Sequence, residues 1–479
     1  MKKTYVTSMP NHIGAFLKAS KCFSSLGINI TRVSYNKAVD SHTLFIDVDG
    51  DDLSIKKADE ILNEIGYLTT DVRQDEIVLL EFTLVDVPGS VTRVLEVISE
   101  FNFNISYISS QENGSGYQYF KMGLYVTDKD RLNTFLSKVR DMCEVKVLDY
   151  NHSEKVYDNS IFYSSYVNAL SKEVGLTKEK ESELLVNVNL AMQTLDERDL
   201  SPYKTFDSIQ RFAQMIANSK GDSFTPRVTV HQITYRTKVT LIEPDCGSNT
   251  AIIESGGERL FVDTGYACYK KEMLSLIKAI LPDFGKKHER VFVTHADVDH
   301  CGLVNEFDEI IVSKESYDSL KNESEGRDGV REVNPLHKPY ASICKILTEY
   351  TPVSRDKLTA ISSNDNYPSI LTQIGVLKVG ELCFEIYEGS GGHVKGETIL
   401  IDYEHKVAFT GDVYVNMSDM TKKQLEYNRY APILMTSVDT DPVLAKKVRD
   451  AVLNRLGEGE WKIFGGHGNV KNYTTKTIK

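Results

Sequence analysis

The densest group of potential metal ligands lies in the segment RVFVTHADVDHCG, residues 290–302. A strand-like apolar run leads into a loop with ligands at positions i, i+2, i+4 and i+5, namely His295, Asp297, Asp299 and His300. Imidazole and carboxylate groups bind Zn, Fe and Mn in proteins, and a strand end holds side chains in fixed directions. The pattern therefore indicates a metal site at the end of a strand.

Further ligands follow later strand-like runs. His393 lies in SGGHVKGET, Asp412 in VAFTGD and His467 in IFGGHG. Asp263 ends the earlier run LFVDTG, and we consider two roles for it. It either orients the ligand loop from outside the metal site or caps the turn after its strand.

Taken in order, the motifs DTG, HxxxDH, GH, TGD and GHG resemble the metallo-β-lactamase superfamily. The resemblance covers about residues 230–475, and we assign residues 229–479 to this domain. It implies an αββα sandwich with a mono- or dinuclear metal site at the edge of two facing sheets. It also implies a water between the metals as the nucleophile, with Asp299 and Asp412 needed for catalysis.

By the same resemblance, two divalent ions (Zn, Fe or Mn) would be held by seven side chains. Each ion would have three ligands and the seventh side chain would bridge both: His295, Asp297 and His393; Asp299, His300 and His467; and Asp412.

Asp297 departs from the hydrolase pattern HxHxDH, because it places a carboxylate where a second histidine is usual. A harder ligand set favours Fe or Mn over Zn. Flavodiiron proteins have HxExDH, and the nuclease-like domain of competence-type DNA-uptake proteins has HxDxDH. The sequence segments around His393 and Asp412 resemble those of the hydrolases. We therefore predict hydrolysis of an ester, phosphoester, thioester or lactone. The alternatives are a diiron protein reacting with O₂ or NO, and a non-enzymatic module with a degenerate site.

The polar, turn-rich stretch 321–345 is predicted to be either a substrate lid or a surface excursion without a role. Within it, His337 either faces the substrate or is exposed to solvent, and we expect it to be exposed. Cys301 is expected to be a small packed residue rather than a metal ligand. Asp441 and Pro442 are typical of a helix N-cap and first helical position.

The N-terminal part contains an internal repeat. Residues 11–35 realign onto 86–109, with Gly14 on Gly89 and Asn29 on Asn104, each pair 75 positions apart. Each copy reads as a glycine loop, an amphipathic helix and a β-rich run. We predict the order βαββαβ twice.

These copies resemble tandem ACT domains, at residues 1–74 and 75–149, which implies ferredoxin-like folds and an amino-acid effector near Gly14 and Gly89. The alternative is that each glycine only opens a tight turn. The first copy most resembles the aromatic-amino-acid-sensing ACT domain of prephenate dehydratase, but it has SYNK (34–37) where those dehydratases usually have Glu-Ser-Arg-Pro. Residues 150–228 are predicted to be a helical linker that spaces a homodimer.

The composition of the chain limits which partners and which cellular compartment we expect. The chain of 479 residues has 56 basic and 68 acidic residues, a net charge of −12, which argues against nucleic acid or a membrane surface as the main partner. The sequence contains no run of 18 consecutive apolar residues, so we predict no membrane span. The seven scattered cysteines suit a reducing cytoplasm. The expected fold class is a multidomain combination of α/β and α+β, acting on a small-molecule substrate.

Overall fold

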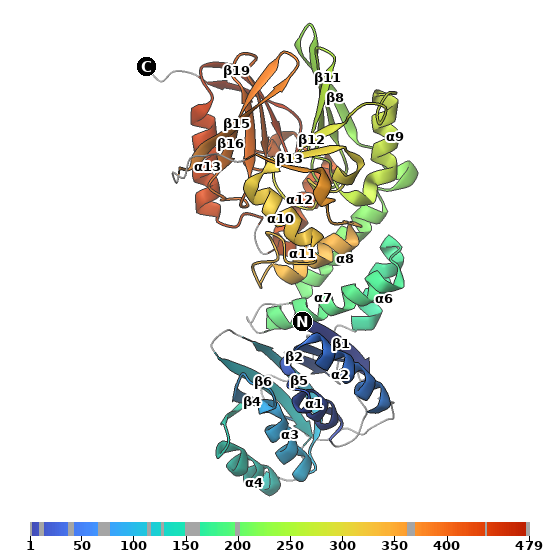
Figure 1. Cartoon of the computed structure of the whole chain (residues 1–479), viewed down its shortest axis with the longest axis vertical. Helices are drawn as coiled ribbons and strands as arrows, with labels where there is room; N and C mark the ends of the chain where they lie inside the picture. Colours follow the sequence, from blue (N-terminus) through green and yellow to red (C-terminus); the bar gives the residue numbers. More distant parts are fainter. Residues whose placement is uncertain are drawn as a thin grey trace. The chain divides into compact units, whose positions relative to one another are not determined.

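The structure is a computed structural model with two compact units (Figure 1). It describes residues 2–8, 14–36, 43–65, 77–112, 116–125, 129–148, 163–196, 202–361, 369–435 and 438–475. The first unit comprises Met1–Ala169 and Glu181–Pro202, and the second comprises Leu170–Lys180 and Tyr203–Lys479. The stretch 150–228 contributes to both units, through α6 (Tyr163–Val174), α7 (Lys178–Asp196) and α8 (Pro202–Ala217).

The first unit contains a seven-stranded sheet with the order β1-β3-β2-β5-β6-β4-β7. Its strands are β1 (Lys2–Ser8), β2 (Asn29–Asn36), β3 (Thr43–Asp49), β4 (Ile77–Val85), β5 (Asn104–Glu112), β6 (Tyr117–Tyr125) and β7 (Glu144–Leu148). Its helices are α1 (Ala15–Ser25), α2 (Asp52–Ile65), α3 (Ser90–Glu100) and α4 (Lys129–Arg140).

Residues 77–148 follow the order βαββαβ, and their strands lie in the ferredoxin-like order β7-β4-β6-β5. The first copy shows βαββα, and the last strand predicted for it would fall in 66–76, outside the described residues. The two copies join through antiparallel pairing of β2 with β5.

The two repeat glycines have a structural explanation. Gly14 and Gly89 cap α1 and α3 with φ of 78° and 87°, a left-handed conformation that favours glycine. A Cβ at Gly89 would lie 2.7 Å from the Ser24 Oγ, and one at Gly14 would lie 3.3 Å from the Ser99 Oγ. The partners are also 75 residues apart, so the repeat is preserved in the packing between the copies.

A buried polar network joins α7 to the sheet of the first unit. The Arg32 guanidinium donates to Asp47 of β3, to Asn189 Oδ1 at 2.6 Å and to Gln193 Oε1 at 2.7 Å. The Gln193 amide donates in turn to the Ser109 Oγ at 2.6 Å. These bonds satisfy polar groups that burial would otherwise leave without partners.

The second unit contains two sheets, with the orders β14-β13-β12-β11-β10-β9-β8 and β15-β16-β17-β18-β19-β20. The first sheet comprises β8 (Arg227–Thr234), β9 (Thr237–Glu243), β10 (Thr250–Ser255), β11 (Glu258–Val262), β12 (Arg290–Phe292), β13 (Glu309–Ser313) and β14 (Leu358–Ile361). The second comprises β15 (Leu371–Val379), β16 (Leu382–Gly389), β17 (Thr398–Asp402), β18 (Val407–Gly411), β19 (Gly459–Gly465) and β20 (Lys471–Thr475). The longer helices after α8 are α9 (Lys270–Ile280), α10 (Lys314–Ser324), α11 (Lys338–Leu347), α12 (Lys422–Met435) and α13 (Pro442–Arg455).

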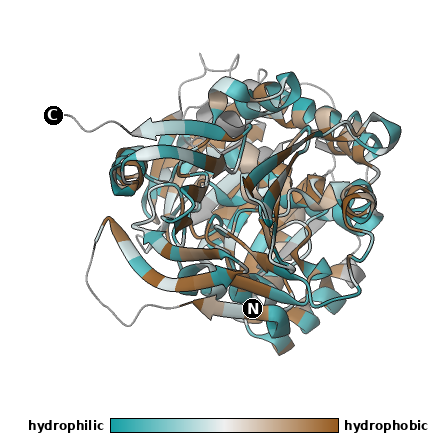
Figure 2. Cartoon of the chain, turned by 90° about the horizontal axis from the view of Figure 1, so that it is seen from above, coloured by the Kyte–Doolittle hydropathy of each residue, from teal (hydrophilic) through white to brown (hydrophobic). Residues whose placement is uncertain are grey.

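Alternation along β17 shows how the layers form. Leu400 points into the core between the two sheets, whereas Ile399 and Ile401 pack on the other face with Val448 and Val452 of α13. Helices in Figure 2 carry hydrophobic and hydrophilic residues side by side, as expected when one helix face is buried. Among the described residues, no helix is long and apolar enough to cross a membrane.

Parallel strand pairs place the candidate metal ligands at the carboxyl ends of neighbouring strands. β11 pairs parallel with β12, and β18 pairs parallel with β19, so the carboxyl ends of each pair meet. Asp263 follows β11, Asp412 follows β18, and His295 and His467 lie two or three residues beyond β12 and β19.

Candidate metal centre

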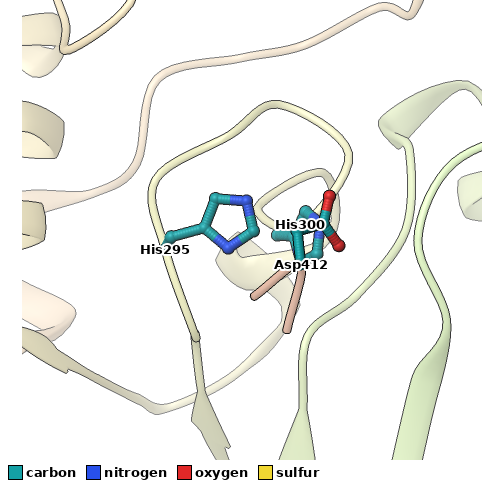
Figure 3. A group of neighbouring side chains, drawn as sticks. All are labelled: His295, His300 and Asp412. Carbon is teal, nitrogen blue, oxygen red and sulfur yellow. The ribbon is translucent and has the colours of Figure 1, made fainter. Parts of the chain in front are cut away.

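The seven side chains of the sequence motifs lie in one cluster of the second unit. Three groups have ligand atoms within 4.8 Å of one another: His295, Asp297 and His393; Asp299, His300 and His467; and His295, His300 and Asp412. Figure 3 shows the last group converging from the loop after β12 and from the end of β18. Gly14 and Gly89 belong to the first unit and not to this cluster.

The centre of the cluster contains buried polar atoms that lack a hydrogen-bond partner. They are the His295 Nε2, the His300 Nε2 and the Asp412 Oδ1. Leaving a buried polar group unsatisfied costs about 1–3 kcal/mol, so three such atoms within one small group need an explanation. A divalent cation satisfies imidazole nitrogens and carboxylate oxygens together, and the residues present therefore fit a metal.

Asp263 orients His300. Its carboxylate accepts hydrogen bonds from the Thr294 backbone N–H at 2.8 Å and the Thr294 hydroxyl at 2.9 Å. The same carboxylate lies 2.9 Å from the His300 Nδ1, which leaves the Nε2 facing the cluster. Of the two roles considered for Asp263, the contacts favour orientation of the ligand loop.

Two acidic residues that the sequence motifs did not indicate hold His393. The Asp439 carboxylate lies 2.9 Å from the His393 Nδ1. The buried Glu397 carboxylate accepts hydrogen bonds from backbone N–H groups of the His393 loop, including His393 itself at 2.9 Å. A sequence signal existed only for Glu397, as an acidic residue four positions after His393 in a glycine-rich turn.

Arg331 is a further residue that the motifs did not indicate. Its guanidinium forms two parallel hydrogen bonds to Asp297, from Nε at 2.8 Å and from Nη2 at 2.5 Å. The Nη2 is also 3.3 Å from the His393 Nε2. Arg331 lies in the polar stretch 321–345, and only that stretch's position between two ligand motifs pointed to it.

The same stretch corrects one prediction and bears on others. His337, expected to be exposed, is buried with 7% of its surface accessible, because the chain folds inward before α11. Cys301 is packed as expected, with its thiol 3.7 Å from the His295 carbonyl oxygen. Asp441 caps α13 as predicted, accepting from the backbone N–H groups of Val443 and Leu444.

Charges within the cluster set its protonation. Burial lowers the pKa of His300, but the carboxylates of Asp263, Asp299 and Asp412 outweigh it and raise that pKa well above the usual value. The pKa of His393 rises to about 9 because contacts with carboxylates also outweigh burial. The raised pKa values favour the protonated forms of His300 and His393 without metal, so a metal would compete with protons at these two side chains.

A cavity of about 320 Å³ adjoins the cluster. Asp299, Asp412 and His467 line one side of it, and apolar residues including Met417 and Met420 line another part. The hydroxyls of Tyr266 and Tyr427, which also line the cavity, are 2.6 Å apart. The stretch 321–345 contributes to the wall through residues including Glu323, Arg331 and Lys345.

Part of the second unit matches a known protein family. Residues 244–467 match the profile of the metallo-beta-lactamase superfamily, so a domain of that superfamily occupies this part of the chain. None of the curated protein sequences matches the chain.

Solved structures show low similarity. A metallo-beta-lactamase from Pontibacter korlensis is 14% identical, covers 51% of this chain and 94% of its own, and has a TM-score of 0.33. A flavoprotein from Thermotoga maritima is 14% identical, with 51% of this chain and 58% of that chain covered and a TM-score of 0.33. For an aspartate kinase from Synechocystis the identity is 14%, the covered shares are 31% and 28%, and the TM-score is 0.25. The matched region thus spans less than a third of that kinase's length.

Proposed function

We propose that the chain is a dinuclear metal-dependent hydrolase acting on an ester, phosphoester, thioester or lactone. The observation that carries this proposal is the position of the seven-residue cluster in the wall of the cavity of about 320 Å³. Pockets for small organic ligands begin at about 300 Å³ and combine apolar walls with a few polar groups. A diatomic gas needs no cavity of this size, which favours an organic substrate.

The chain's own residues have distinct roles in this proposal. The clustered imidazoles and carboxylates would hold two ions, with Asp412 central because its carboxylate lies 3.4 Å from both the His300 Nε2 and the His467 Nε2. Asp263 and Asp439 fix the tautomers of His300 and His393. Divalent ions bound there would supply Lewis acidity and a nucleophilic water at neutral pH. The apolar walls would exclude bulk water and orient the substrate.

Elemental analysis of protein purified without added metal is the first test. We expect about two Zn or Mn per chain, and turnover of at least one compound in a screen of esters, phosphoesters, thioesters and lactones. Two metals per chain with no hydrolysis in that screen, after reconstitution with Zn and with Mn, would contradict the proposal.

Asp297 supports a second candidate, a diiron protein that reacts with O₂ or NO. Its carboxylate Oδ2 lies 3.4 Å from the His295 Nε2 and 3.5 Å from the His393 Nε2, within the cluster, and a harder ligand set favours iron. Two Fe per chain and rapid reoxidation of the ferrous protein by O₂ or NO would favour this candidate over hydrolysis.

For the first unit, we propose two ACT domains that bind an amino-acid effector and help to form a homodimer. The ferredoxin-like order of residues 77–148 supports the fold, and the Gly89 loop borders a hollow of about 1170 Å³. An effector that changes the affinity of the metal site for a ligand must in return bind differently when that site holds the ligand. A set of amino acids that changes neither the Tm nor the rate would contradict this proposal.

A further inference from the structure

We propose that Arg331 competes with metal for Asp297, so that the two halves of the centre load unequally. The half formed by Asp299, His300 and His467 would fill first. The half formed by His295, Asp297 and His393 would fill second and more weakly. The inference rests on the proposed metal centre, and does not depend on the reaction that the centre performs.

The contact between Arg331 and Asp297 uses both oxygens of the carboxylate. Planar guanidinium groups match carboxylates in this two-bond geometry, which is stronger than a single charged hydrogen bond. Arg331 therefore occupies one acceptor site on each Asp297 oxygen and offsets the negative charge that would attract a metal. The guanidinium also brings a positive charge to within 3.3 Å of the His393 Nε2, where it repels a cation.

Arg331 is held in place by more than its partner. Its Nη1 donates to the Val438 carbonyl oxygen at 2.9 Å. Its neighbour Glu332 pairs with Lys345 of α11, and Lys345 also lies 3.1 Å from Glu323 of α10. The segment that carries the arginine is thus tied to both flanking helices, and a metal must compete with a positioned guanidinium rather than with a mobile side chain.

The other half of the cluster has no such competitor. Among the described residues, the ion pairs of Asp299 and Asp412 are with histidines, at 3.4–3.9 Å. The buried His300 Nε2 lacks a hydrogen-bond partner, as does the His295 Nε2 of the other half, so the two halves differ in the fixed cation at Asp297 and not in these atoms. An ion that binds here displaces no fixed cation, which is why we expect this half to load first.

The test is a metal titration of the full-length chain after chelator treatment, with Mn²⁺ and separately with Zn²⁺. Calorimetry would measure the two dissociation constants, and elemental analysis after dialysis would count the ions retained. The variants are Arg331→Gln, which removes the charge and the two-bond geometry, and Arg331→Lys, which keeps only the charge. The control is Arg449→Gln, because Arg449 lines the same cavity but donates its Nε to the Val413 carbonyl oxygen.

We expect the wild type to bind the first ion at least about tenfold more tightly than the second. Arg331→Gln should tighten the second step by about tenfold, and Arg331→Lys should lie between the two. Arg449→Gln should leave both steps unchanged. Two equal steps in the wild type, or a second step in Arg331→Gln that is no tighter, would overturn the inference.

Thermal unfolding separates this role from a purely structural one. In metal-free protein, Arg331→Gln should lower the Tm, because Asp297 loses its buried partner. The rise in Tm on adding metal should be larger in Arg331→Gln than in the wild type, because the second ion binds more tightly. A purely structural arginine would lower the Tm of both forms and leave the second binding step unchanged, which would overturn the inference.

The outcomes also distinguish this inference from the proposed function. Unequal loading that Arg331→Gln abolishes, without hydrolysis in the substrate screen, would support the inference and contradict only the proposed reaction. Failure of both ions to bind wild type and Arg331→Gln would overturn the inference and the metal centre together.

Discussion

Each unit of this chain contains a buried arginine that makes a bidentate contact with an aspartate, but the surroundings of the two pairs differ. Arg32 contacts both oxygens of Asp47 in the first unit, and Arg331 contacts both oxygens of Asp297 in the second. The Arg32 and Arg331 side chains are 4% and 7% exposed. Arg32 has further acceptors on α7, and among the described residues of the first unit no buried polar side-chain atom lacks a hydrogen-bond partner.

Around Arg331 the polar atoms are only partly satisfied. The Nε2 atoms of His295 and His300 and one oxygen of Asp412 are buried without a hydrogen-bond partner. A fully hydrogen-bonded polar network stabilises packing. In a partly bonded network, buried polar groups without partners cost free energy, and a ligand that bonds to them removes that cost. The network around Arg32 fastens α7 to its sheet, whereas the network around Arg331 is one that an ion would complete in the proposed function.

Replacement of the central carboxylate should have the largest effect. In Asp412→Asn, the loss of negative charge between His300 and His467 should remove metal from the protein and lower activity by about 10³-fold, equivalent to about 4 kcal/mol. Elemental analysis and the rate on any substrate found would measure this. Exposed Asp450→Asn in α13 is the control, and retention of two ions by Asp412→Asn would refute the ligand assignment.

Replacement of the structural arginine should act on stability alone. Arg32→Met would leave Asp47, Asn189 and Gln193 without their buried donor and should lower the free energy of unfolding of the first unit by about 3 kcal/mol. Urea unfolding would measure this, with exposed Arg140→Met as the control. Metal content should stay unchanged, and a loss of metal would break the distinction between the two networks.

Replacement of an outer partner should give an intermediate effect on binding. Asp263→Asn keeps the shape and tolerates φ of 56°, but it removes the charge beside the His300 Nδ1. Metal affinity should fall about 10–100-fold, as is typical when such a partner is removed. Calorimetry would measure the fall. Asp441→Asn serves as the control because asparagine also caps a helix, and equal affinities in Asp263→Asn and the wild type would exclude the orienting role.

Glu388 of β16 should give the smallest effect and tests a carboxyl that forms no ion pair among the described residues. Burial, with Glu315 and Glu397 nearby, raises the pKa of Glu388 to about 7 from 4.5. A raised pKa means that its protonation stabilises the fold below about pH 4.5, and this contribution is lost as the pH rises through 7.

Glu388→Gln should therefore flatten the dependence of stability on pH between 5 and 8. At pH 8 it should raise the free energy of unfolding by about 1 kcal/mol relative to the wild type, a figure reduced for partial solvent screening. Urea unfolding at pH 5 and pH 8 would measure this, beside the exposed control Glu460→Gln. A wild type whose stability did not fall between these pH values would contradict the assignment.

Much of the fold and the ligand set could be predicted from local sequence. A strand end fixes the directions of side chains two residues apart, so the residues 295–300 could be read as one ligand loop. The repeat of Gly14 at Gly89 predicted two copies of one unit, and both glycines have the left-handed backbone that such turns require. These features depend on neighbours within a few residues of the chain.

What only the tertiary structure decided depends on residues far apart in the chain. Arg331 reaches Asp297 across 34 positions and Asp439 reaches His393 across 46, and no local pattern marks either contact. His337 was expected to be exposed because its stretch is polar, but it is buried at the start of α11. Local sequence therefore determined which groups could bind a metal. Long-range packing decided which of them have their charge satisfied by the chain itself, because charge compensation depends on distance in space and not on spacing in sequence.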